Sequence, residues 1–129
     1  MTAPRLEHAN LSVRDIDETI KFLQTALPQL VVRADRRGPD GVRWVHIGTD
    51  DHYIAISDLP PRFNHLGFEV DDADAVRERL VAAGYTNTIV SNDHPARVRM
   101  YFDDAEGAEW EFVQYLSDDP ATRNDYDLG

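Results

Sequence analysis

Apolar and polar residues change their spacing several times along the chain, and each change marks the edge of a predicted element. Residues 6–13 form a short apolar-rich run typical of a strand. From Ile16 to Leu27 the apolar positions recur mostly every three or four residues, which predicts an amphipathic helix with Asp15 as its cap and Pro28 after its end. Three strand-like segments follow, separated by turn-rich stretches, at residues 30–34, 42–47 and 53–57.

The second half of the chain repeats this order. A strand over 62–70 precedes a helix over about 72–83, which Gly84 closes in the manner of a C-cap glycine. Three further strands are predicted at residues 87–91, 98–102 and 109–116. The sequence therefore predicts an α+β fold, a single domain over 1–129. Its parts are a first βαβββ module of about 5–58, a second of about 62–116, and an acidic tail over 117–129.

The repeat is visible in the residues as well as in the elements. HANLSVRD, beginning at His8, aligns with HLGFEVDD, beginning at His65. Further along, Val42-Arg43-Trp44 matches Val98-Arg99-Met100. The two copies of this second match are one residue closer in the sequence than His8 and His65 are, so the second module has lost one residue between the two matches. We interpret the pattern as an internal duplication.

Composition narrows the classes of partner. The chain has 13 Lys and Arg against 24 Asp and Glu, and its net charge of −11 opposes binding to nucleic acid or to an anionic membrane. The charge either serves solubility or favours a cationic ligand. No apolar run reaches the roughly 20 residues of a membrane span, and the first residues lack a secretory apolar core, so a cytoplasmic protein is expected. Cysteine is absent, so that any bound metal must use His, carboxylate or water.

Three residues could carry chemistry. His8 and His65 occupy equivalent places in the two modules, and Glu111 lies between Trp110 and Phe112, where alternation turns its carboxylate away from both aromatics. A divalent cation held by two imidazoles would offset the cost of burying that carboxylate, and Fe(II), Mn(II), Ni(II) or Zn(II) would suit this ligand set. The alternative is that both histidines are hydrogen-bonded core residues and that Glu111 pairs with an arginine such as Arg99.

Three motifs resemble a known superfamily: HxxLxVxD from His8, HLGFEVDD from His65, and YFDDAEGAEWEF from Tyr101. They are similar to motifs of the glyoxalase/bleomycin-resistance/extradiol-dioxygenase superfamily, also called vicinal oxygen chelate proteins. The resemblance covers about residues 5–116. It implies two βαβββ modules with helices outside a concave mixed sheet, a divalent metal bound by His8, His65 and Glu111, and a homodimer.

One departure from the family pattern bears on the reaction. Glyoxalase I-like members carry a fourth ligand, usually Glu, on the last strand of the first module. In this chain the two alignments of the internal repeat make Ala55 or Ile54 the counterpart of Glu111. Neither side chain can bind a metal. The gap argues against lactoylglutathione isomerisation and against chemistry like that of methylmalonyl-CoA epimerase. It leaves an open three-ligand site like that of extradiol dioxygenases and thiol transferases.

Two residues near the third motif complete the predicted site. Alternation from Val98 to Phe102 places Arg99 and Tyr101 on one face, where Arg99 would neutralise Glu111 or bind an anionic substrate. A dioxygenase also needs an acid or base, for which Tyr101 is the candidate, with His46 and His94 as further candidates by residue type. In their turn-rich contexts, however, His52 and His94 are more typical of solvated side chains.

We therefore expect a metal-dependent lyase, isomerase or extradiol-type dioxygenase that acts on a small oxygen-chelating molecule, with Glu111 and Tyr101 as catalytic residues. The alternative is a metal-free protein that binds a small molecule, as bleomycin-resistance proteins do. A third hypothesis is an inactive member kept for interaction or regulation, with the tail at 117–129 as its contact.

Overall fold

In the computed structural model, which describes residues 3–91 and 93–128, the described residues form eight strands and three helices. The strands and the first two helices follow the predicted order, and the third, short helix lies in the tail, where none was predicted. The side chains of residues 90 and 91 lie outside this description. The α+β class and the two βαβββ repeats are confirmed. The chain divides into two compact units. We call His8–Asn64 the first module, and the residues up to Glu7 together with those from His65 onward the second module.

The first module contains one helix and four strands. They are β1 (Arg5–Ser12, from His8 onward), α1 (Ile16–Ala26), β2 (Val31–Arg37), β3 (Arg43–Gly48) and β4 (Tyr53–Ser57). The strand order is β2-β3-β4-β1. Only the β1–β4 pair is parallel, so this sheet is mixed.

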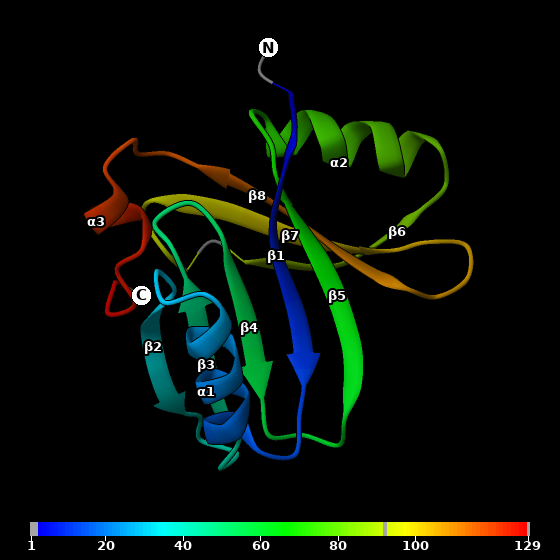
Figure 1. Cartoon of the computed structure of the whole chain (residues 1–129). Coiled ribbons are helices and arrows are strands. Elements are labelled where there is room, and N and C mark those ends of the chain that lie inside the picture. The colour runs from blue at the N-terminus through cyan, green and yellow to red at the C-terminus, as the bar shows by residue number, and fades with distance from the viewer. Residues whose placement is uncertain (1–2, 92, 129) are drawn as a thin grey trace. The chain divides into compact units, whose positions relative to one another are not determined.

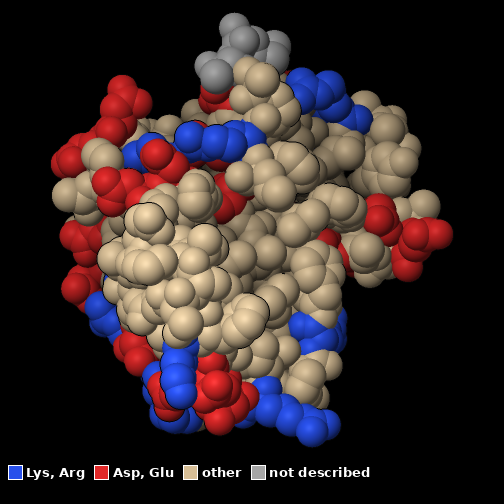
Figure 2. All heavy atoms as spheres, viewed as in Figure 1, with Lys and Arg blue, Asp and Glu red and all other residues tan. Residues whose placement is uncertain are grey.

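Helix α1 forms where the sequence predicts it. The Asp15 carboxylate accepts a hydrogen bond from the Glu18 amide at 3.0 Å, as an N-cap does, and the helix ends two residues before Pro28. The helix covers one face of the sheet (Figure 1). Its Ile16 packs with Val45, Ile47 and Ile56 in the core. The charged residues of α1, Asp17, Glu18 and Lys21, lie in its N-terminal half, and residues 22–26 are uncharged (Figure 2).

The second module repeats this arrangement and adds a short helix. Its elements are β5 (Arg62–Glu69, from His65 onward), α2 (Ala73–Ala82), β6 (Thr86–Ser91), β7 (Arg97–Asp103), β8 (Glu109–Tyr115) and α3 (Pro120–Arg123). The strand order is β5-β8-β7-β6, and β5 pairs with β8 in parallel.

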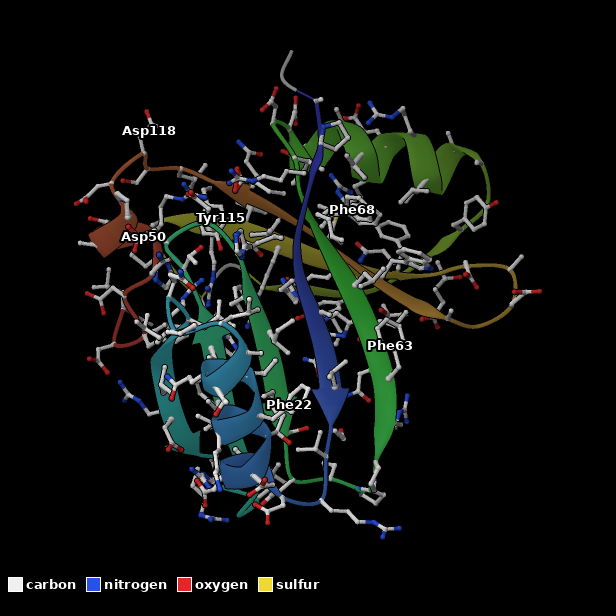
Figure 3. All side chains as sticks on the ribbon, viewed as in Figure 1. Phe22, Asp50, Phe63, Phe68, Tyr115 and Asp118 are labelled. Carbon is white, nitrogen blue, oxygen red and sulfur yellow. The ribbon has the colours of Figure 1, made fainter. Side chains whose placement is uncertain are left out.

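Helix α2 covers one face of the second sheet. Ala73 of the helix packs with Met100 and Phe102 of β7, and Phe68 lies on the side of the sheet that faces the helix (Figure 3). Gly84 follows the helix with φ +92°, a left-handed conformation that favours glycine, as predicted. The opposite face of the sheet is left for the polar residues of β5, β7 and β8.

The predicted match between Val42-Arg43-Trp44 and Val98-Arg99-Met100 is wrong by one residue. His8 pairs with Tyr53 as His65 pairs with Glu109, which makes Ala55 the counterpart of Glu111. Ala55 pairs with His46 and Glu111 pairs with Tyr101, so strand pairing aligns His46 with Tyr101. A slip of one residue exchanges the faces of a strand, so Trp44 corresponds to Arg99 and does not correspond to buried Met100.

The tail packs against its own module. The Arg123 guanidinium bonds the Glu69 carboxylate at 2.7 Å and lies 4.1 Å above the Tyr115 ring. His94, which is only 6% exposed, contacts the Asp125 carbonyl through Nε2 at 2.8 Å. The expectation that His94 is a solvated turn residue is therefore wrong, because the tail covers it.

Across the described part of the chain, every helix is too short or too polar to cross a membrane.

Candidate metal centre

The polar face of the second sheet brings three predicted site residues together. In β7, Val98, Met100 and Phe102 pack toward α2, which leaves Tyr101 on the other face. Tyr101 is the cross-strand partner of Glu111, and His65 lies on the neighbouring strand β5. The alternation of β7 and β8 therefore positions these side chains on the face away from the core.

His65 and Glu111 form a buried imidazole–carboxylate pair. Nε2 of His65 lies 3.3 Å from Oε1 of Glu111, and the two residues are 6% and 4% exposed. Two ligands that each stand 2.0–2.2 Å from one cation at a tetrahedral angle are about 3.3–3.6 Å apart. The pair therefore has the spacing and the donor types of two ligands that share a divalent cation.

Glu109 approaches the other nitrogen of the same imidazole. Nδ1 of His65 lies 3.0 Å from Oε1 of Glu109, although the ring N–H is not aligned with that oxygen as a hydrogen bond requires. A carboxylate near Nδ1 favours the tautomer with its proton there, and this tautomer leaves the Nε2 lone pair for a metal. Glu109 was not predicted, although it lies two positions before Glu111 and so on the same face of β8.

Replacing Glu109 with Gln is expected to weaken binding of a divalent cation about 10- to 100-fold, because the tautomer of His65 loses its anionic partner. Calorimetric titration with Zn(II) measures the effect. Glu106→Gln, an equal change of charge at an exposed turn residue, is the matched control. Equal affinities of the Glu109 variant and the parent would show that Glu109 does not support His65.

Tyr101 is held as a neutral phenol. Burial raises the pKa of Tyr101 well above its usual range, the nearby Glu111 carboxylate adds to this rise, and the Arg99 charge opposes it. The ring of Tyr101 meets the His65 ring edge-on at 5.5 Å between centroids. The phenol O–H hydrogen-bonds with Glu111, and it therefore donates to the carboxylate.

The raised pKa predicts that Tyr101 resists ionisation until the protein unfolds. The chain has five tyrosines, and Tyr101→Phe should leave the tyrosinate absorbance of the folded protein at pH 11 unchanged. Because the folded-state pKa is the higher one, stability linked to Tyr101 is complete below about pH 10 and declines above it. Denaturant should therefore release more tyrosinate from the parent than from Tyr101→Phe. Equal release would contradict the assignment.

The first module has a polar face of different composition. His8, which is 4% exposed, stacks on Tyr53 at 4.7 Å, and His46 stacks on the same ring at 4.3 Å. The Arg33 guanidinium lies 4.5 Å from the Tyr53 ring. Gly48 faces Tyr53 across the strands, and a side chain at Gly48 would meet the Tyr53 backbone at 2.5 Å. Ala55, the counterpart of Glu111, offers no ligand atom, so the predicted gap is assigned to Ala55 and Ile54 is excluded.

Paired βαβββ modules with an imidazole–carboxylate contact on the polar face define a recognised class of protein. A family model described as the Glyoxalase/Bleomycin resistance protein/Dioxygenase superfamily matches residues 5–112. The chain therefore belongs to this superfamily, which confirms the resemblance of the three motifs.

Solved structures agree on the fold. Methylmalonyl-CoA epimerase from Mycobacterium tuberculosis is 19% identical, with a TM-score of 0.69 over 91% of this chain and 94% of its own. A hypothetical protein from Bacillus halodurans is 14% identical, with a TM-score of 0.71 over 92% and 99%. A methylmalonyl-CoA epimerase in complex with methylmalonyl-CoA and NH4+ is 16% identical, with a TM-score of 0.69 over 90% and 97%. No curated protein sequence matches the chain.

Proposed function

We propose that the protein is a metal-dependent enzyme that binds one divalent cation, Fe, Mn, Ni or Zn, through His8, His65 and Glu111. Its substrate would be a small molecule that chelates the cation through neighbouring oxygens. The observation that carries the proposal is the buried 3.3 Å contact between His65 and Glu111. A divalent cation between the two side chains would offset the cost of burying the carboxylate beside an imidazole.

His8 is proposed as the third ligand because it is the duplicate of His65. Each histidine lies on the first strand of its module and pairs with the first residue of the parallel last strand. His8 pairs with Tyr53, and His65 pairs with Glu109. Each is also a buried imidazole on the polar face of its own sheet. Two imidazoles and one carboxylate leave coordination positions for substrate, as a catalytic site requires.

A bound cation would act as a Lewis acid that polarises the substrate oxygens. Tyr101 would keep the proton on its phenol oxygen beside Glu111 and could donate a hydrogen bond to a substrate oxygen, a role that suits its raised pKa. Glu111 would be both ligand and proton acceptor. A lyase, an isomerase and an extradiol-type dioxygenase can all use this set. A two-carboxylate mechanism lacks its second carboxylate, because Ala55 stands at that place.

Metal analysis of protein purified without chelators tests the proposal. One divalent ion per chain is expected, bound again after chelation and raising the melting temperature as a ligand of the native state does. No bound metal, together with no thermal response to Mn(II), Fe(II), Ni(II) or Zn(II), would refute it.

The second candidate is a metal-free protein that binds a small molecule, as bleomycin-resistance proteins do. The stacked rings of His8, Tyr53 and His46 support this alternative, because they make the polar face of the first module aromatic. Thermal stabilisation by an aromatic ligand in the presence of chelator, with no response to metals, would favour it over the enzyme.

We also propose a homodimer. The exposed apolar side chains of α1 and its C-cap, Phe22 at 69% and Leu27 at 51%, support it (Figure 3). Sedimentation equilibrium would give twice the mass of 14.7 kDa, and a monomer would refute the proposal.

A further inference from the structure

Two arginines extend the polar face of β7 away from the proposed cation site. Arg97 and Arg99 alternate with Val98 and Met100, which pack toward α2, and they therefore share a face with Tyr101. Same-face residues are spaced about 6.6–6.8 Å along a strand. Arg99 lies one such step from Tyr101 and Arg97 lies two, so that a row of positive charge leads from the Glu111 end of the face.

Arg97 has a buried guanidinium N–H without a hydrogen-bond acceptor among the described residues. The residue is partly buried, and this N–H is that of Nε, which is inaccessible to solvent. None of the described carboxylates forms an ion pair with it, although acidic residues outnumber basic ones by 24 to 13. A buried guanidinium N–H without an acceptor is costly, and such a group is suited to an anion that arrives with a ligand.

A second cation borders the same place. Arg97 pairs across the strands with Tyr115, at the end of β8 that leads into α3 (Figure 3), and the Arg123 guanidinium lies 4.1 Å above the Tyr115 ring. Arg123 bonds Glu69 through Nη2 at 2.7 Å, but its Nε is also buried and has no acceptor in the described residues. Glu69 is already engaged by Arg5 and Arg123, so its charge is neutralised.

We infer that Arg97 and Arg99, with Arg123 beside them, form a subsite for an anionic group of the substrate, a carboxylate or a phosphate. The inference rests on the proposed function, because the chelating oxygens and the anionic group would belong to one molecule. The substrate is then an anionic small molecule whose charged group lies one or two residue pairs along β7 from the metal-binding oxygens. The net charge of −11 either serves solubility or favours a cationic ligand elsewhere, because Arg97 and Arg99 make this end of the face positively charged.

Titration of the metal-free chain with inorganic phosphate and, separately, with glutarate tests the subsite and distinguishes phosphate from carboxylate. Arg97→Gln is expected to weaken binding of the preferred anion about 10- to 100-fold, as loss of charge-assisted hydrogen bonds does. The anion affinity of Arg97→Lys should lie between those of the parent and of Arg97→Gln, because lysine keeps the positive charge and lacks the planar guanidinium. Arg14→Gln, an equal change of charge at an exposed residue, is the control and should bind as the parent does.

Stability provides a second measurement that does not depend on affinity. Arg97→Met should melt at or above the temperature of the parent without an anion, because a buried donor without an acceptor is removed. The anion should raise the melting temperature of the parent and leave that of Arg97→Met unchanged.

Equal anion binding by the parent and Arg97→Gln, an equal loss in Arg14→Gln, or destabilisation of Arg97→Met without anion would overturn the inference. Since metal is left out, the two proposals fail separately. Metal binding without anion binding rejects the subsite alone, and anion binding without metal binding rejects the cation site alone.

Discussion

Replacing Glu111 with Gln is expected to lower the affinity for a divalent cation by more than about 100-fold, beyond the usual effect of removing a group that only supports a ligand. Glu111 is the one anionic ligand of the proposed set. Glutamine has nearly the same shape and can still accept the hydrogen bond from Tyr101. The fold should therefore survive, and the stability of the metal-free variant should stay within about 1 kcal/mol of the parent.

Zn(II) or Mn(II) titration of Glu111→Gln measures this loss. Glu78→Gln, on the exposed surface of α2, is the matched control, because it removes an equal charge far from any proposed ligand in the sequence. If both variants bind the cation as the parent does, Glu111 is not a ligand. An equal loss in both would show that the effect comes from net charge.

Replacing Met100 or Ile47 with Ala is expected to lower the free energy of unfolding by about 2–5 kcal/mol in each case. Met100 is 1% exposed under α2, and Ile47 is fully buried under α1, so each truncation leaves a cavity in its own module. Urea denaturation followed by circular dichroism gives the values.

His46→Ala is the comparison for Ile47→Ala, because His46 is the neighbouring residue of β3 on the opposite, polar face. A smaller loss is expected, since the imidazole is only partly buried. A loss for His46→Ala that exceeds that for Ile47→Ala would contradict the assignment of the two faces and with it the alignment of the modules.

The order and type of the elements could be predicted because local signals agree with the fold. Asp15 caps α1, Gly84 ends α2, and the apolar residues alternate or recur as their elements require. These signals lie within a few residues of the element that they define. They can therefore be recognised in the sequence without knowledge of the tertiary structure.

The residue-level alignment of β3 with β7 could not be predicted. β2 and β6 each contain a bulge, between Val32 and Ala34 and between Asn87 and Ile89, and the two bulges are equivalent in the same alignment that matches His46 with Tyr101. The short VRW and VRM match is accidental, and pairing with the neighbouring strand decides the register.

The candidate site was predictable where one strand determines it. Alternation around Glu111 placed its carboxylate opposite two aromatics, and the same rule could have found Glu109 two positions earlier. Strand alternation places Arg97 on the same face as Arg99 and could have been applied to the sequence. That the Arg97 Nε has no hydrogen-bond acceptor among the described residues is a property of the folded chain. His94 could not be assigned, because its burial depends on the tail, which reaches it through the distant Asp125.

The proposed function depends on one cation that is held by two imidazoles and one carboxylate. Pulsed electron paramagnetic resonance of the Cu(II)-loaded protein tests it most directly, because couplings to the remote ring nitrogens count the bound imidazoles. The parent is expected to show two imidazoles, and His8→Ala and His65→Ala are each expected to show one. A spectrum with a single imidazole in the parent, or one unchanged by His8→Ala, would contradict the proposal.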